Sequence, residues 1–116
     1  MSVLALARVV RPAMNKTEAA YADHLEQLRQ VGHIVTWLFE AITLKLGDDC
    51  RYTPDFLVIH ADRTVELVEV KGFWRDDARV KIRVAAQRFP WFRFTGIRRE
   101  RGAWHPEHFG PEEKRT

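Results

Sequence analysis

Two acidic residues and a lysine occupy neighbouring β-like segments near the middle of the chain, and side chains of these types can hold a metal ion and activate water. Asp55 precedes the apolar run FLVIH, and Glu69 and Lys71 lie at alternate positions of the run TVELVEVKG. If residues 61–63 form the turn between the two runs, counting back along both strands places Asp55 opposite Glu69. Cross-strand partners lie about 5 Å apart, and like charges there destabilise a sheet.

Two arrangements would offset this repulsion between Asp55 and Glu69. In the first, the sheet ends in a salt bridge and Lys71 neutralises one carboxylate. In the second, a divalent cation lies between the carboxylates, because hard cations such as Mg²⁺ prefer oxygen ligands and are held by one or two carboxylates with phosphate and water. Burying an incompletely paired charge costs several kcal/mol, so the second arrangement is favoured. Period-two alternation places the apolar neighbours of the pair on its own face of the sheet: Leu57, Ile59, Val65 and Leu67.

A first helix is predicted over residues 15–31, ahead of these strands. Asn15 and Glu18 have the spacing of a capping box, and a glycine follows the last apolar residue. Glu18 lies three residues before Tyr21 and seven before Leu25, which places it on the apolar face of the helix. Its carboxylate is therefore expected to point toward the body of the protein.

The remaining elements complete a compact α/β unit. The residues from 34 to 72 form three β-rich runs, IVTWLFEAITLKL, YTPDFLVIH and TVELVEVKG, which predict three strands joined by antiparallel connections. A second helix is expected from residue 76 to about 89, where Pro90 stops it, and a last strand over 91–97. The polar stretch that follows shows no periodicity. The order helix, three strands, helix, strand predicts a mixed sheet flanked by helices.

Length and charge limit the function classes. The chain has 116 residues and a single cysteine, Cys50, which excludes an intramolecular disulfide and a thiolate zinc ribbon. No stretch is apolar for the roughly 18 residues that a membrane span needs, and the first residues lack a secretory pattern, so a cytoplasmic protein without a membrane partner is expected. Residues 1–72 carry eight Lys and Arg against ten Asp and Glu, whereas residues 73–116 carry eleven against six. The basic half is interleaved with aromatic residues, a mixture suited to phosphate contacts and typical of nucleic-acid binding.

The acidic residues and the lysine carry a resemblance to a known family. Tyr52-Thr53-Pro54-Asp55-Phe56, followed by Glu69-Val70-Lys71-Gly72, resembles the signature of the PD-(D/E)XK nuclease superfamily, and Glu18 stands where that family often has an acidic residue on its first helix. The resemblance extends over about residues 15–97 and is strongest to short phage- and prophage-encoded nuclease-like proteins, which are similar to phage junction-resolving endonucleases. It implies a restriction-endonuclease-like core with the order α-β-β-β-α-β.

This resemblance implies a role for each site residue. Asp55 and Glu69 would hold Mg²⁺ or Mn²⁺ with the backbone carbonyl of Val70, Lys71 would orient or polarise the attacking water, and Glu18 would complete the acidic cluster or support a second metal. The reaction would be the hydrolysis of DNA phosphodiester bonds by an endonuclease, in the cytoplasm of a bacterium or a phage-infected cell. DNA contacts are expected from the second helix and the residue before it: Arg75, Arg79, Lys81, Arg83, Gln87 and Arg88.

Substrate, assembly and some flanking segments stay open at this point. Selection by DNA structure, such as a junction or branch, is expected because no base-reading motif is evident. The alternative is a non-catalytic nucleic-acid-binding subunit that retains a nuclease fold.

The chain is expected to divide into three parts. Residues 1–14 form an extension that could add an edge strand, exchange between subunits or be unstructured. Residues 15–98 form the nuclease domain, and residues 99–116 form a polar tail. Cutting both strands of a junction would need a homodimer, for which residues 3–10 and 91–94 are candidate contacts. His105 and His108 are interpreted as surface residues, and the role of Glu40 stays open.

Overall fold

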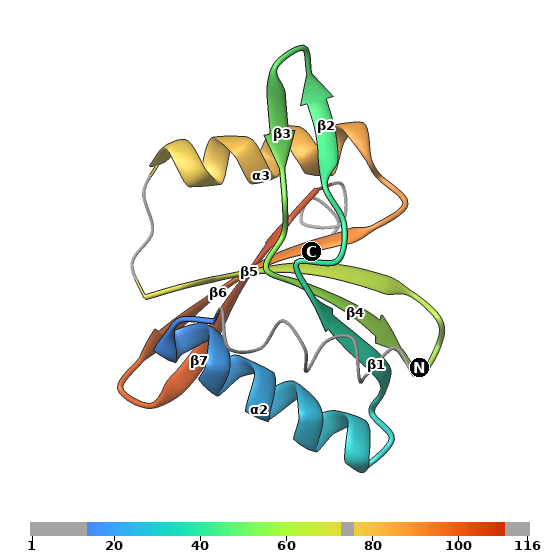
Figure 1. Cartoon of the computed structure of the whole chain (residues 1–116), viewed down its shortest axis with the longest axis vertical. Coiled ribbons are helices and arrows are strands. Elements are labelled where there is room, and N and C mark those ends of the chain that lie inside the picture. Colours follow the sequence, from blue (N-terminus) through green and yellow to red (C-terminus); the bar gives the residue numbers. More distant parts are fainter. Residues whose placement is uncertain (1–13, 73–75, 111–116) are drawn as a thin grey trace.

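A computed structural model describes residues 14–72 and 76–110 of the chain. The described residues form two helices and seven strands (Figure 1). In chain order these elements are α2 (Lys16–Gln30), β1 (Ile34–Phe39), β2 (Leu44–Gly47), β3 (Cys50–Tyr52), β4 (Phe56–His60), β5 (Val65–Lys71), α3 (Asp76–Arg88), β6 (Arg93–Glu100) and β7 (Ala103–Phe109). No helix within the described ranges is long and apolar enough to cross a membrane.

Five of the strands form one mixed sheet in the order β1-β4-β5-β6-β7. β5 and β6 are parallel, and the other neighbours in this sheet are antiparallel. A parallel pair needs a long crossover, which here contains α3, whereas short turns join the antiparallel pairs β4–β5 and β6–β7. The protein is therefore an α/β fold with a mixed sheet, as the sequence predicts.

The two helices cover opposite faces of this sheet (Figure 1). α2 buries Tyr21, Ala22 and Leu25 against one face, in a core that also contains Trp37 and Phe56. On the other face, α3 packs in a second core, whose members come from α3, the small β2–β3 sheet and the central strands: Leu44, Leu46, Tyr52, Leu67, Ile82, Ala85, Ala86, Phe94 and Phe109. Since both faces are covered, polar side chains on the central strands lie in a poorly hydrated interior.

The predicted cap of α2 and the predicted stop of α3 are confirmed. The side chain of Asn15 accepts a hydrogen bond from the backbone N–H of Glu18 at 2.8 Å, and the side chain of Glu18 accepts one from the backbone N–H of Asn15 at 2.9 Å, which completes a capping box. α3 ends at Arg88, two residues before Pro90. These local signals set the start of α2 and the end of α3.

The first predicted strand, by contrast, is two strands in different sheets. Its chain turns at Glu40, which has a left-handed backbone with φ of 48°, and the following residues pair with β3 instead of continuing the main sheet. β2 and β3 form a two-stranded hairpin that projects from the body beside α3 (Figure 1). We refer to residues 43–53 as the hairpin arm.

The prediction of a polar tail from residue 99 onward is also wrong, because residues 99–109 contain strand structure. β6 continues to Glu100, and β7 returns antiparallel to it as an edge strand. The two-residue turn between them uses Arg101 and Gly102, both with positive φ, as a type I′ hairpin turn requires. β7 buries Phe109 but leaves most of its other residues exposed, so its sequence lacks the apolar alternation of an inner strand.

The predicted subunit contacts receive different environments. Residues 3–10 lie outside the described part of the chain. In the second predicted segment, the Trp91 side chain is 76% exposed, whereas Phe94 is 1% exposed and belongs to the core under α3. Of Trp91 and Phe94, only Trp91 is exposed enough to contact a second subunit.

Candidate active site

The pairing of β4 with β5 brings Asp55 and Glu69 together. Leu57 pairs with Leu67 and Ile59 with Val65, which is the predicted register. Asp55 immediately precedes β4 and, in this register, lies opposite Glu69. The exposed fractions are 7% for Asp55 and 9% for Glu69, so both carboxylates are buried.

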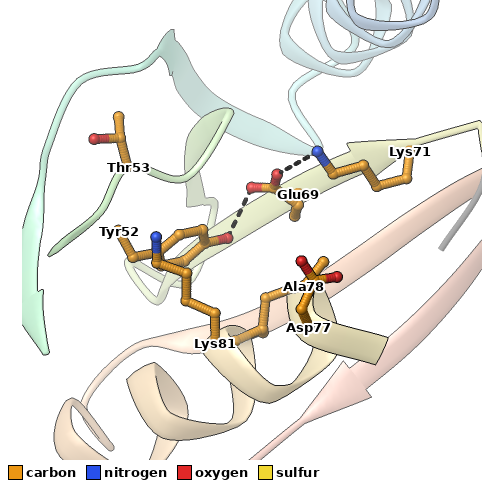
Figure 2. A pocket seen from close by; sticks show the side chains of 8 residues that line it. Tyr52, Thr53, Glu69, Lys71, Asp77, Ala78 and Lys81 are labelled. Atoms are coloured by element: carbon orange, nitrogen blue, oxygen red, sulfur yellow. Dashed lines mark hydrogen bonds and ion pairs between the residues drawn. The ribbon is translucent and has the colours of Figure 1, made fainter. Parts of the chain in front are cut away.

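Each carboxylate receives hydrogen bonds from groups that the folded chain places beside it. Asp55 Oδ2 accepts a hydrogen bond from the backbone N–H of Val70 at 2.8 Å. Glu69 Oε1 accepts one from the phenol of Tyr52 at 2.8 Å, and the Nζ of Lys71 lies 3.1 Å from Glu69 Oε2 (Figure 2). The salt bridge between Glu69 and Lys71 is the first of the two arrangements that the sequence allowed. Asp55 Oδ1 makes no hydrogen bond with the described part of the chain, which leaves this oxygen available to a ligand.

The charges in this cluster still repel each other. Burial, together with the nearby charge of Glu69, raises the pKa of Asp55 to about 8, although the hydrogen bond from Val70 and the charge of Lys71 act in the opposite direction. Burial lowers the pKa of Lys71, but its carboxylate neighbours outweigh that effect and the pKa is raised overall. Burial and the charge of Glu69 raise the pKa of Tyr52, which keeps its phenol protonated as a donor. One lysine therefore does not neutralise the carboxylate pair.

Glu18 lies at the edge of this cluster. Its side chain is partly buried and completes the capping box of α2. Its charge adds to the raised pKa of both Asp55 and Lys71, so it is close enough to act on them electrostatically. The predicted role of Glu18 in the acidic cluster stays a prediction, and its structural role at the helix N-terminus is confirmed.

A pocket of about 340 Å³ opens beside Glu69 and Lys71, between β3, β5 and α3 (Figure 2). Its lining contains two lysines and two acids with polar and apolar neighbours: Tyr52, Thr53, Glu69, Lys71, Asp77, Ala78, Lys81 and Ile82. Glu69, rather than Asp55, lines this pocket. A ligand in the pocket would contact Glu69 directly and lie between the ammonium groups of Lys71 and Lys81.

The donor set suits a metal held by few protein ligands. Within residues 14–72 and 76–110, no group of three or more His, Cys, Asp or Glu side chains could hold a metal ion. Mg²⁺ does not need such a group, because it commonly keeps several waters and takes one or two carboxylates plus phosphate oxygens from its substrate. Asp55 and Glu69 fit that description. The part assigned to the Val70 carbonyl stays a prediction.

The described residues expected to contact DNA fall into two groups, those that contact β7 and those that are exposed or line the pocket. Arg75 lies outside the described residues. Arg79 forms an ion pair with Glu107 at 3.3 Å, and the guanidinium of Arg83 lies 5.8 Å from the centre of the Phe109 ring, so both are engaged with β7. The other three keep open surroundings, because Lys81 lines the pocket while Gln87 and Arg88 are exposed.

Sequence reasoning missed the polar walls of the pocket. Tyr52, Thr53 and Asp77 line it, and Tyr52 also orients Glu69. The sequence does contain a signal that could have placed Tyr52 near the site. Tyr52 is an aromatic residue at the end of a strand, two positions before Pro54-Asp55. His105 and His108 are both exposed on β7, as expected of surface histidines, and Glu40 is exposed at the end of β1.

Comparison with known families gives one assignment. The family described as "Protein of unknown function (DUF1064)" matches residues 13–101, which include Glu18, Asp55, Glu69 and Lys71. Because the match covers most of the chain, the protein belongs to this family. Searches of curated proteins and of solved structures gave no match.

Proposed function

We propose that this protein is a metal-dependent endonuclease that hydrolyses DNA phosphodiester bonds with Mg²⁺ or Mn²⁺. The observation that carries the proposal is the buried Asp55–Glu69 pair, whose repulsion Lys71 only partly offsets and which adjoins a pocket with a second lysine. A buried, incompletely paired charge costs several kcal/mol. A divalent cation between the carboxylates would remove that cost and give the pair a function.

In this proposal each residue of the site has a separate role. Asp55 and Glu69 would hold the metal, which would supply a water of lowered pKa and stabilise charge on the phosphate. Lys71 lies against Glu69 and would orient or polarise the attacking water. Lys81, on the α3 side of the pocket, would bind the phosphate. Glu18 would add negative charge that strengthens metal binding.

The order of the central elements supports this assignment. α2, β1, β4, β5, α3 and β6 follow the helix, three strands, helix and strand order of the restriction-endonuclease-like core. β2–β3 and β7 would then be additions to that core. Asp55 immediately precedes β4, and Glu69 and Lys71 lie at the end of β5. A substrate can reach Glu69 and Lys71 through the pocket, which adjoins the start of α3.

The proposed substrate is DNA selected by its structure, such as a junction or another branch, in a phage or prophage setting. The support is the basic charge of residues 73–116, which favours salt-dependent contacts with phosphates. A homodimer would allow paired cuts in a junction, and Trp91 is an exposed residue of the segment predicted for such a contact.

One observation favours a second function, a non-catalytic nucleic-acid-binding subunit. Both oxygens of Glu69 already have protein partners, Tyr52 and Lys71, and a site of that kind can be structural. A cleavage assay distinguishes the two functions. Labelled duplex, single-stranded, flap and four-way junction DNA would be incubated with Mg²⁺ or Mn²⁺. Endonuclease activity predicts cleavage of at least one substrate, whereas binding without cleavage of any would support the subunit.

A further inference from the structure

The hairpin arm presents two cations directly opposite each other on its exposed side. Lys45 and Arg51 are register partners in the β2–β3 ladder, so their side chains leave the same face. Both residues are exposed, and like charges in this position destabilise a hairpin. Asp48 offsets them weakly, since its carboxylate lies 3.8 Å from the Lys45 ammonium, and Arg51 has no ion-pair partner within the described ranges. An external anion would relieve the repulsion.

The opposite face of the arm fixes it to the body of the protein. Leu44, Leu46 and Tyr52 are buried in the core under α3. An isolated two-stranded hairpin is only marginally stable in water, so this apolar face is what holds the arm in place. The Tyr52 phenol also donates its hydrogen bond to Glu69, which links the arm to the candidate active site. The cationic face is therefore held at a fixed position relative to that site.

Hydroxyl groups continue the cationic face toward the pocket. The hydroxyl oxygens of Thr43 and Thr53 lie 2.7 Å apart at the base of the arm. Thr53 also lines the pocket that contains Glu69 and Lys71 (Figure 2). Lysine, arginine and threonine side chains are common donors to nucleic-acid phosphates. The outer face of the arm, made of Thr43, Lys45, Arg51 and Thr53, thus leads from solvent to the pocket.

We infer that the outer face of the hairpin arm binds the phosphate backbone of the nucleic-acid substrate next to the bond that lies in the pocket. This inference rests on the proposed function and adds to it a second contact surface, separate from α3. Lys45 and Arg51 neutralise two phosphates, and the hydroxyls at the base guide the strand toward Lys71. Asp48 and Asp49 at the tip mark the outer limit of the contact, because they would repel further phosphates.

The salt dependence of DNA binding tests this surface. On duplex DNA each phosphate contact contributes about 0.9 to the magnitude of the slope of log K against log salt. A Lys45→Gln/Arg51→Gln double variant should therefore lower the magnitude of the slope for a labelled 20-base-pair duplex, measured in EDTA by fluorescence anisotropy, by roughly 1.8. A Lys16→Gln/Arg63→Asn double variant is the matched control. It removes the same charge from exposed residues on α2 and the β4–β5 turn, and should leave the slope nearly unchanged.

A second variant separates lost binding from lost folding. Arg51→Glu places opposite charges across the ladder, so it should raise the melting temperature by about 1–4 °C while weakening DNA binding. Equal slopes for the arm variant and its control would overturn the inference. If the wild type binds and cuts DNA in that case, the proposed function survives alone. A wild type that binds no nucleic acid would overturn both.

Discussion

Replacing Asp55 with asparagine should stabilise the metal-free protein. The substitution keeps the size of the side chain and an oxygen that can accept the hydrogen bond from Val70, but it removes the buried charge that faces Glu69. A residue that served only the fold would lose stability in this change. A gain would show that the carboxylate is kept for another purpose.

The pKa of Asp55 sets the size and the pH range of this effect. A rise from 3.8 to about 8 means that between these values the unfolded chain releases a proton that the folded chain keeps, so the free energy of unfolding falls as pH increases. At about 1.4 kcal/mol per pKa unit, the cost at pH 7 is at most roughly 4 kcal/mol. The asparagine amide accepts a weaker hydrogen bond from Val70 than the carboxylate does, and this difference reduces the gain in the free energy of unfolding by about 1 kcal/mol. We expect a net gain of about 1–3 kcal/mol.

Thermal unfolding of the wild type and Asp55→Asn in EDTA, between pH 4 and pH 8.5, measures this difference. The two melting temperatures should agree near pH 4 and diverge by roughly 4–12 °C above pH 7. Asp48→Asn, at an exposed position of the arm, should follow the wild type at every pH. Mg²⁺ at a hundredfold excess over its Kd should add about 2.7 kcal/mol to the stability of the wild type and of Asp48→Asn, but not to that of Asp55→Asn. A difference that is independent of pH, or a less stable variant above pH 7, would refute the electrostatic argument.

Four further predictions concern the site and the assembly. Lys71→Ala should abolish most cleavage and leave DNA affinity nearly intact, because one charge adds little to a diffuse phosphate contact; equal losses would make Lys71 a phosphate anchor. Tyr52→Phe should cost about 1–2 kcal/mol of stability and weaken Mg²⁺ binding in calorimetry, since Glu69 loses its buried donor. Glu18→Gln keeps an oxygen that accepts the capping hydrogen bond, so it should lower cleavage and leave the melting temperature unchanged. That result would show that the charge of Glu18 acts in the active site. Light scattering should show a dimer for the full chain and a smaller species for a chain that starts at Met14; a full-length monomer that makes paired cuts would contradict the dimer.

The parts of the fold that local chemistry determines were predictable. A capping box needs only Asn15 and Glu18 at the right spacing, and the turn at 61–63 sets the register that brings Asp55 to Glu69. Such features depend on a few neighbouring residues, so they can be read without knowledge of the tertiary structure. The acidic pair and its lysine belong to this class.

The hairpin arm and β7 were not predictable in this way. The chain leaves the main sheet at Glu40 and turns at Arg101, two residues with left-handed backbone whose types give no signal for it. Tyr52 meets Glu69 only because β3 packs over β5, and Arg79 meets Glu107 only because α3 packs beside β7. The pocket depends on such non-local packing.

The central claim is that Asp55 and Glu69 hold a metal for phosphodiester hydrolysis. Its most direct test is cleavage of a labelled four-way junction and its component duplex by the wild type, Asp55→Asn and Glu69→Gln, with Mg²⁺, with Mn²⁺ and with EDTA. The claim predicts cleavage by the wild type only with a divalent cation, and a loss of at least roughly a hundredfold in both variants, which should remain folded. Cleavage that persists in either variant or in EDTA would contradict it.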